Sequence, residues 1–373
     1  MTVAPVRDLR APTLAEIRTA RERLDGIALR TPLLRLEWEP PAAAGAPPQI
    51  YLKLESLQPI GSFKLRGATN AMLQAAQAVQ AAPAGRESPL AGGVYTASAG
   101  NMAQGVAWGA RRLGVAATAI VPDHAPATKL AAIERLGGTV VKVPFERWWQ
   151  VIVEHRYPGM PGLFIHPVSD TAVMAGNGTI GLEIMEQLPG VDLVLVPFGG
   201  GGLSCGIAAA LRELRPQAAV HGCEVTTAAP LAASLAAGAP RTVDYQPSFV
   251  DGIGGKALLP EMWPIVSRLL AGSHVVPVAA VAAAVRLLAE RHRIIAEGAG
   301  ATAVAAAMAL AAAADDAPDA GAGPAAGGAG GEAGAAAGAA KRPAVAGRKI
   351  VCIVSGGNID AAKLATILTG GVP

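Results

Sequence analysis

The chain has 373 residues, of which 51% are hydrophobic and 16% are charged, and its formal net charge at pH 7 is +3. That length allows one large or two medium domains, and the small net charge on scattered Lys and Arg residues excludes a basic face for nucleic acid. The three cysteines, Cys205, Cys223 and Cys352, stand in apolar or small-residue runs, which favours reduced thiols over a disulfide framework or a zinc site.

The N-terminal region contains no apolar run at Met1–Arg10, so no signal peptide is predicted there. The next segment, Thr13–Leu24, has apolar residues at helical spacing. Thr13 followed three residues later by Glu16 is the pattern of a capping box. We therefore predict that the first helix begins at Thr13.

Short apolar runs then alternate with longer helical segments. The best strand candidates are Ile50–Leu54, Gly93–Ala97, Ala116–Val121, Thr139–Val143, Leu193–Pro197, Val220–Cys223 and Lys349–Val354. The helices predicted between them are Asn101–Leu113, Lys129–Leu136, Gly178–Gln187 and Leu203–Leu214. This alternation predicts an α/β protein with parallel, helix-covered sheets, in which ligands bind at the strand ends.

Two segments near the C-terminus depart from this pattern. Ala299–Ala314 is mostly alanine and too short and too weakly hydrophobic to span a bilayer. Residues 315–347 are almost entirely Ala, Gly and Pro without a periodic apolar face, so a disordered surface insertion is predicted. We expect a cytoplasmic protein with neither membrane nor nucleic-acid partner.

Ser62–Ala68, with the sequence Ser-Phe-Lys-Leu-Arg-Gly-Ala, follows the strand Ile50–Leu54 and a turn. A lysine in this place, Lys64, is usually a solvated residue in the first turn of a helix. The alternative is an amine desolvated enough to lose its proton and to form a Schiff base. Alone, this segment does not decide between them.

Pro197–Leu203 contains four consecutive glycines, Gly199, Gly200, Gly201 and Gly202, between a strand and a helix. Their N–H groups and the helix N-terminus can bind a phosphate monoester without a lysine. The spacing matches neither a nucleotide P-loop nor the Gly-x-Gly-x-x-Gly dinucleotide pattern. A simple flexible turn is the alternative.

Two further loops follow strand ends. Ser98, Ala99, Gly100 and Asn101 could bind a carboxylate at a helix N-terminus, or Ser98 could be an ordinary helix cap. In Ser355–Asn358 a hydroxyl could face a ligand, or the segment could be a glycine turn. The joint occurrence of a lysine, an anion loop, a carboxylate loop and a hydroxyl at strand ends favours pyridoxal 5′-phosphate (PLP) chemistry.

On these motifs, from about Arg30 to Ala361, the sequence resembles the serine/threonine dehydratase (threonine ammonia-lyase) group of fold-type II PLP enzymes, which includes serine racemase. The resemblance implies a tryptophan synthase β-like fold, with two parallel-sheet, three-layer domains and the cofactor in the cleft between them. It implies a large domain of residues 1–69 and 168–373, a small domain of residues 70–167, and a homodimer.

The resemblance also implies a role for each motif residue. Lys64 would carry PLP as a Schiff base and act as the catalytic base, with Phe63 against the pyridine ring. Gly199, Gly200, Gly201, Gly202 and Leu203 would hold the phosphate, and Ser355 would meet the pyridine nitrogen. Asn101 would bind the phenolic oxygen, and Ser98, Ala99, Gly100 and Asn101 would bind the substrate carboxylate. The implied reaction is β-elimination from a small 3-hydroxy amino acid such as L-threonine or L-serine, giving a 2-oxo acid and ammonia.

Three other activities stay open at this point. An amino-acid racemase of the same fold is disfavoured, because family racemases have a serine where this chain has Ala99. A β-replacement synthase is disfavoured by Leu65, which stands where those enzymes have aspartate. A non-catalytic amino-acid sensor is disfavoured by the intact Lys64. Relatives with a divalent cation use an acidic residue, a carbonyl four residues later and a carboxylate six residues later. These positions are Glu224, Ala228 and Pro230 here, so no divalent cation is expected, whereas a monovalent ion bound by carbonyls stays open.

Several residues have weaker predicted roles. Glu297 and Asp251 resemble cofactor-facing family positions, although Glu297 could equally be a carboxylate at a helix entry. His166 is interpreted as structural or solvated rather than catalytic. The substrate pocket wall is expected near Trp148, Trp149 and Asp170, and Met102 is expected to shape the pocket.

Overall fold

The computed structural model describes residues 9–39, 46–80, 88–313 and 345–373. The predicted insertion at residues 315–347 lies outside these residues except for its last three positions. None of the helices in the described ranges is long and apolar enough to cross a membrane.

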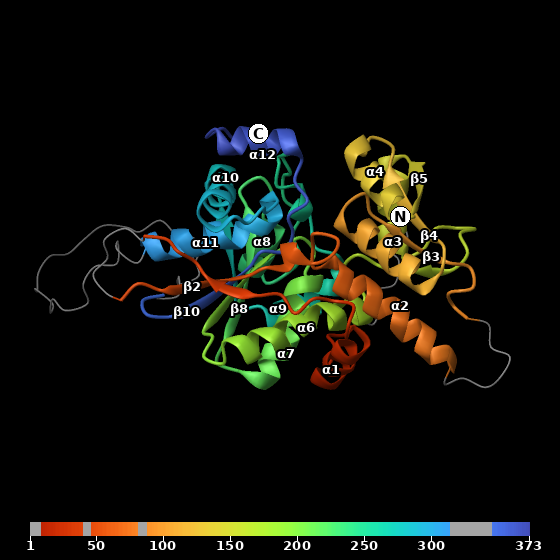
Figure 1. The fold of residues 1–373 in the computed structure, drawn as a ribbon, viewed down its shortest axis with the longest axis horizontal. Coiled ribbons are helices and arrows are strands. Elements are labelled where there is room, and N and C mark those ends of the chain that lie inside the picture. The colour runs from red at the N-terminus through yellow and green to blue at the C-terminus, as the bar shows by residue number, and fades with distance from the viewer. Residues whose placement is uncertain (1–8, 40–45, 81–87, 314–344) are drawn as a thin grey trace, which may run out of the picture.

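The larger sheet has six strands in the order β1-β2-β10-β7-β8-β9, and only β1 runs antiparallel to its neighbour (Figure 1). Its strands are β1 (Leu33–Arg35), β2 (Gln49–Lys53), β7 (Leu193–Pro197), β8 (Ala219–Val225), β9 (Gly272–Val276) and β10 (Lys349–Ile353). The C-terminal strand β10 therefore lies between β2 and β7, in the middle of the sheet.

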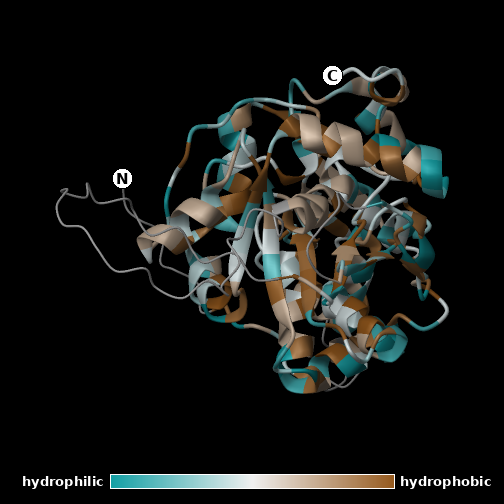
Figure 2. Ribbon diagram, turned by 90° about the vertical axis from the view of Figure 1, so that its left-hand side faces the viewer, coloured by the Kyte–Doolittle hydropathy of each residue, from teal (hydrophilic) through white to brown (hydrophobic). Residues whose placement is uncertain are grey.

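Helices cover both faces of the larger sheet, α10 and α11 on one side and α6 and α7 on the other (Figure 1). In β7, Leu193 and Leu195 enter one core while Val194 and Val196 enter the other. This is why the strand is a continuous apolar run instead of an alternating one. In Figure 2 these hydrophobic strands lie in the interior, and hydrophilic residues lie on the outer helices.

The smaller sheet has four parallel strands in the order β5-β4-β3-β6. These are β3 (Val94–Ala97), β4 (Ala117–Pro122), β5 (Thr139–Val143) and β6 (Leu163–Phe164). Together with α3 and α4 they form a separate body on the right of Figure 1. The fold is thus α/β with two parallel sheets, as predicted.

The helices of the described residues follow in chain order. They are α1 (Leu14–Arg23), α2 (Lys64–Gln80), α3 (Asn101–Leu113), α4 (Ala127–Arg135), α5 (Phe145–Glu154), α6 (Thr171–Gln187), α7 (Gly202–Leu214), α8 (Pro230–Ala237), α9 (Trp263–Leu269), α10 (Val278–Leu287), α11 (Gly298–Ala313) and α12 (Ala361–Leu368). Short 3-10 turns lie at η1 (Glu55–Leu57), η2 (Asp251–Ile253) and η3 (Pro260–Met262), and a π-helical turn, η4 (Leu288–His292), follows α10.

Helix α2 contacts both α3 of the smaller body and α6 beneath the larger sheet. It runs without interruption through residues 69 and 70, where the sequence predicts a domain boundary. The start of α2 is held by a buried charge network. Arg66 donates to Glu55 at 2.8 Å and to Glu183 at 2.6 Å. Lys53 donates to Glu183 at 2.5 Å.

The capping box at Thr13 and Glu16 is confirmed. The predicted start of the helix at Gly178 is wrong, because α6 begins at Thr171 with Asp170 as its cap. The early part, residues 171–177, contains Gly176, which lowers its helix propensity and hides it in the sequence. The structure needs this glycine, since a Cβ atom on Gly176 would lie 2.4 Å from the carbonyl oxygen of Arg66.

Candidate active site

A cavity of about 680 Å³ lies between the two sheets, at the carboxyl ends of strands from both. Residues from all four sequence motifs line it: Phe63, Lys64, Ser98, Ala99, Gly100, Asn101, Gly199, Gly200, Gly201, Gly202, Leu203 and Ser355. The motifs are far apart in the chain. They meet because each follows a strand or precedes a helix whose end faces the cavity.

Lys64 is the first residue of α2 and lies beside the end of β10. The N–H of Phe63 donates to the carbonyl of Ser355 at 3.0 Å, and the N–H of Gly357 donates to the carbonyl of Gly61 at 2.9 Å. These two backbone hydrogen bonds fix Lys64 relative to Ser355, whose side chain is buried.

The amine of Lys64 is desolvated. Burial lowers its pKa to about 8, although the negative charge of Glu297 opposes the shift. The Nζ atom donates a hydrogen bond of 2.8 Å to the carbonyl oxygen of Pro167 and lies 5.1 Å from the centre of the Phe63 ring. A lysine with this pKa is neutral in a substantial fraction of molecules near pH 8, as an amine nucleophile or base must be.

The glycine loop forms a cradle for an anion. Gly201 has a φ of 98°, which favours glycine, and α7 begins at Gly202, which lines the cavity together with Leu203. A Cβ atom on Gly200 would lie 2.7 Å from Cγ1 of Val168. A Cβ atom on Gly202 would likewise lie 2.9 Å from the carbonyl oxygen of Val168, so these two positions have no room for side chains and leave the backbone to contact a ligand.

The loop at Ser98–Asn101 is held by a chain of amide side chains. Asn358 donates to the carbonyl of Ile60 and to Oδ1 of Asn101, both at 2.8 Å. Asn101 in turn donates to Glu297 at 2.9 Å. The Oγ of Ser98 accepts a hydrogen bond from the N–H of Gly100 at 3.2 Å. Asn358 orients the side-chain amide of Asn101, so the NH₂ group of Asn101 faces Glu297.

The sequence alone predicted no definite role in the site for Glu297 or Asn358, but both residues line the cavity. Burial raises the pKa of Glu297 to about 7, although the hydrogen bond from Asn101 opposes the shift. Its carboxyl group is therefore a second titratable group near neutral pH. In the sequence, Glu297 is the first residue of Glu-Gly-Ala-Gly-Ala and Asn358 is the last residue of Ser-Gly-Gly-Asn. These two motifs are the sequence features that could have indicated a site role.

Other residues considered from the sequence have different places. Trp148, Trp149 and Met102 line the cavity, and Asp251 at its edge pairs with Lys129 at 2.7 Å. The expectation for Asp170 is wrong, because it lines a second, smaller cavity and its carboxylate accepts from two N–H groups of α6 as a helix cap. His166 also lines this second cavity.

Glu224 is buried, and its carboxylate is hydrogen-bonded at both oxygens. It accepts hydrogen bonds from the N–H groups of Leu231 and Ala232 at 2.7 and 2.8 Å and from Ser273 at 2.7 Å. Within the described part of the chain, no group of three or more His, Cys, Asp or Glu side chains could hold a metal ion. The expectation of no divalent cation stays a prediction.

Comparison with known proteins decides the family. The family described as "Pyridoxal-phosphate dependent enzyme" matches residues 25–322. The chain belongs to this family. It is 33% identical over 363 residues to an L-threonine ammonia-lyase of Thermotoga maritima, covering 96% of this chain and 79% of that relative.

Solved structures of the family have the same fold. A threonine deaminase of T.th. superposes with a TM-score of 0.75 at 30% identity, covering 94% of this chain and 99% of that one. A serine racemase of Dictyostelium discoideum gives a TM-score of 0.72 at 28% identity, covering 94% and 99%. The fold is therefore that of the fold-type II PLP enzymes.

The residues of this PLP enzyme fit its cofactor. The glycine cradle, which a Cβ atom would fill, suits the phosphate, and the buried amine of Lys64 suits the aldehyde. The buried hydroxyl of Ser355 is a neutral partner for a ring nitrogen.

Gly201→Ala is expected to weaken PLP binding about tenfold, because the left-handed conformation costs an alanine about 1–2 kcal/mol and the loop would shift to relieve it. Fluorescence or absorbance titration of the cofactor-free protein measures the dissociation constant. Gly238→Ala is the matched control, since Gly238 also has a positive φ, 63°, but ends α8 in open space. Equal PLP affinities in both variants would contradict the assigned role of the loop.

The rate of PLP incorporation into cofactor-free protein is expected to rise with pH, with a midpoint near 8 rather than near the ordinary lysine value of 10.5. Only the neutral amine attacks an aldehyde, and burial of Lys64 makes it neutral at lower pH. Stopped-flow absorbance over a pH series measures the midpoint. Glu297→Gln should lower it further, because the Glu297 charge stabilises the protonated amine. A midpoint near 10 would show that Lys64 is solvated.

Proposed function

We propose that this enzyme is a hydroxy amino acid ammonia-lyase that converts L-threonine or L-serine to a 2-oxo acid and ammonia. The observation that carries the proposal is a single cavity with one desolvated amine, Lys64, and with Ala99 in the loop assigned to the substrate carboxylate. The name of the Thermotoga maritima relative, an L-threonine ammonia-lyase, supports the same reaction.

We assign the roles as follows. The loop Gly199–Gly202 with Leu203 holds the cofactor phosphate, Phe63 lies against the ring, and Asn101 and Ser355 contact its oxygen and nitrogen. Ser98, Gly100 and the backbone of Ala99 hold the substrate carboxylate at the N-terminus of α3, where helix N–H groups favour an anion.

When bound, PLP would act as an electron sink that stabilises the negative charge developing on the substrate's α-carbon as its C–H bond breaks. Lys64 accepts the α-proton on Nζ, and the C–H electron pair forms the Cα–Cβ double bond as the Cβ–O bond breaks. The leaving hydroxyl takes up the proton held on Nζ and departs as water, which returns Lys64 to the neutral amine. Ser355 would offer a neutral hydroxyl to the ring nitrogen, whereas a carboxylate there would keep a proton on that nitrogen. The neutral partner would favour loss of the leaving group over a long-lived carbanion. The released enamine takes up water and yields the 2-oxo acid and ammonia.

The test is incubation of the PLP-loaded protein with L-threonine, L-serine and bulkier 3-hydroxy amino acids. We expect 2-oxo acid and ammonia in equal amounts and no inverted enantiomer. The racemase alternative predicts the D-enantiomer at a comparable rate, which chiral chromatography detects. Absence of any product with all of these substrates would contradict the lyase assignment.

Ala99→Ser is expected to introduce slow racemisation of L-serine while elimination continues. A hydroxyl at this position can deliver a proton to the substrate, whereas the alanine methyl group cannot. D-serine formation by the variant and by the parent is compared at equal 2-oxo acid output. If the variant forms no more D-serine than the parent, residue 99 does not decide between the two reactions.

We also propose that the two sheets mark two domains, residues 1–69 with 168–373 and residues 70–167, that the enzyme is a cytoplasmic homodimer, and that no divalent cation is needed. The four-stranded sheet falls within 70–167, and the three cysteines are free and buried. Light scattering measures the assembly, and activity after EDTA treatment tests the cation.

A further inference from the structure

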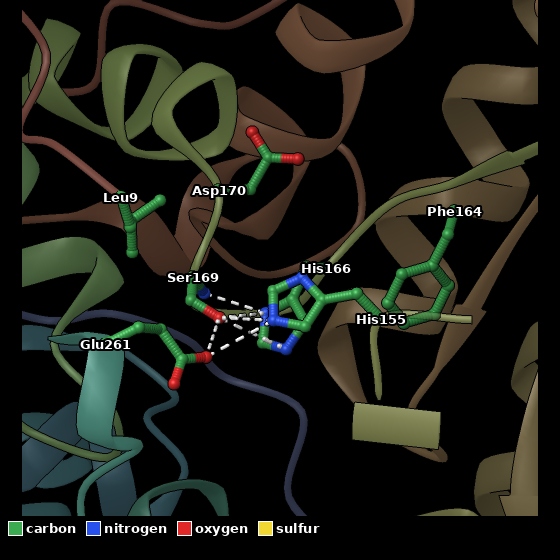
Figure 3. A pocket seen from close by; sticks show the side chains of 7 residues that line it. All are labelled: Leu9, His155, Phe164, His166, Ser169, Asp170 and Glu261. Atoms are coloured by element: carbon green, nitrogen blue, oxygen red, sulfur yellow. Dashed lines mark hydrogen bonds and ion pairs between the residues drawn. The ribbon is translucent and has the colours of Figure 1, made fainter. Parts of the chain in front are cut away.

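A second cavity, of about 280 Å³, lies where the smaller body meets the larger one (Figure 3). His155, at the end of α5, and His166, just after β6, come from the smaller body. Ser169 lies directly before α6, and Glu261 comes from η3 of the larger body. None of these four side chains has a place in the reaction proposed above.

His166 organises the residues around it into a tight turn, residues 166–169, here called the His166 turn. Its Nδ1 accepts hydrogen bonds from the N–H groups of Val168 at 3.0 Å and Ser169 at 2.7 Å. The proton of the ring is therefore on Nε2, which donates to the carbonyl of Ile152 at 3.1 Å. Burial lowers the pKa of His166 to about 3, so the ring stays neutral and keeps accepting.

The His166 turn contacts both halves of the cofactor site. The carbonyl of Pro167 accepts the 2.8 Å hydrogen bond from Lys64. Val168 packs on the glycine loop, where a Cβ atom on Gly202 would lie 2.9 Å from the Val168 carbonyl oxygen. A small shift of this turn would therefore change the position of the Lys64 amine and of the glycine loop Gly199–Gly202.

Glu261 fixes the turn from the other side (Figure 3). Its Oε1 accepts hydrogen bonds from Ser169 Oγ at 3.0 Å and from His155 Nε2 at 3.2 Å. Burial raises the pKa of Glu261, but the hydrogen bonds from His155 and Ser169 outweigh it and lower the pKa to about 2, so the group is a carboxylate.

His155 completes the contact by stacking on His166, with ring centres 4.1 Å apart. Its backbone has a φ of 56°, which is uncommon for a residue other than glycine, and this conformation ends α5. The side chains of His155 and Glu261 are 7% and 11% exposed, so water competes little for these hydrogen bonds.

We propose that Glu261, Ser169 and His155 form a clasp between the two bodies that holds the His166 turn and thereby positions the Lys64 amine. The clasp residues are positioning residues, since none of them lines the larger cavity of the cofactor site. The inference extends the proposed function, because a displaced amine accepts the α-proton poorly while the substrate's carboxylate site is unchanged.

Ser169→Ala removes one hydroxyl of the clasp, and Ser234→Ala is its matched control. Ser234 is likewise buried and donates to the carbonyl of Pro230, but it lies in α8, outside both cavities. Glu261→Gln keeps the shape and the acceptor oxygen and removes the charge. We expect Ser169→Ala and Glu261→Gln to lower kcat for L-threonine about tenfold with KM within about twofold. Ser234→Ala should keep both constants while losing a similar amount of thermal stability.

A second measurement does not depend on turnover. The Pro167 carbonyl stabilises the protonated form of Lys64, so a displaced turn should lower the pH midpoint of PLP incorporation by about half a unit. If L-threonine is not a substrate, this shift still tests the clasp. The inference is wrong if both clasp variants keep the midpoint and kcat of the parent, or if Ser234→Ala changes them equally.

Discussion

Lys64→Ala is expected to lower kcat for L-threonine by at least about 10⁴-fold, because the variant loses both the amine that holds PLP and the base that accepts the α-proton. The fold should survive, since Lys64 is desolvated and takes no part in the buried charge network. Release of 2-oxo acid, measured with PLP in excess, gives the rate.

The control for this variant is Lys142→Ala, in which an exposed lysine of β5 is removed. Its kcat should equal that of the parent. Borohydride reduction and peptide mapping give an independent result, with pyridoxyl label on the Lys64 peptide of the parent and none in the variant. Label on another lysine of the parent, or substantial turnover by Lys64→Ala, would contradict the central assignment.

Arg66→Met is expected to lower the free energy of unfolding by about 3–5 kcal/mol, which is the usual loss when one partner of a buried ion pair is removed. The Arg66, Glu55 and Glu183 side chains are 2%, 0% and 8% exposed. In the parent, the charge of Arg66 overcomes burial and lowers the pKa of Glu55. Without Arg66, only the charge of Lys53 and the hydrogen bond from Thr31 oppose the burial that raises the pKa of Glu55.

Urea denaturation at pH 7 measures the loss. Arg286→Met is the control, because its ion pair with Glu290 joins two half-exposed side chains and should contribute less than about 1 kcal/mol. The pH dependence of the free energy of unfolding also distinguishes the parent from Arg66→Met. A lowered carboxylate pKa gives stability above the unfolded value of 4.5 that is lost at lower pH, so the difference between parent and variant should shrink in acid. A loss below about 1 kcal/mol for Arg66→Met would contradict the network.

The sequence predicted the fold class and the motif residues of the cavity well, for a physical reason. Lys64, the glycine loop and Ser355 each depend on a local pattern, a strand followed by a turn or a helix, and such patterns lie within short stretches of the chain. The parallel strands then bring these ends to one place.

The sequence could not predict the contacts that join these local patterns. The hydrogen-bonded chain from Asn358 through Asn101 to Glu297 spans residues that are 257 and 196 positions apart. The clasp joins Ser169 to Glu261, 92 positions away. No local spacing indicates such a pairing. The early part of α6 was missed because Gly176 serves close helix packing, whereas propensity alone predicts a weak helix there.

The place of β10 in the middle of the larger sheet has a consequence for biosynthesis. The backbone hydrogen bond from Phe63 to Ser355, which holds Lys64 in place, joins an early part of this sequence to a much later one, and β2 and β7 have no shared neighbour until β10 inserts between them. A chain still on the ribosome can complete the smaller body, but its vitamin-binding site has to wait until β10 emerges. Loading with PLP should therefore follow synthesis of β10, and truncated chains ending before Lys349 should not retain the vitamin.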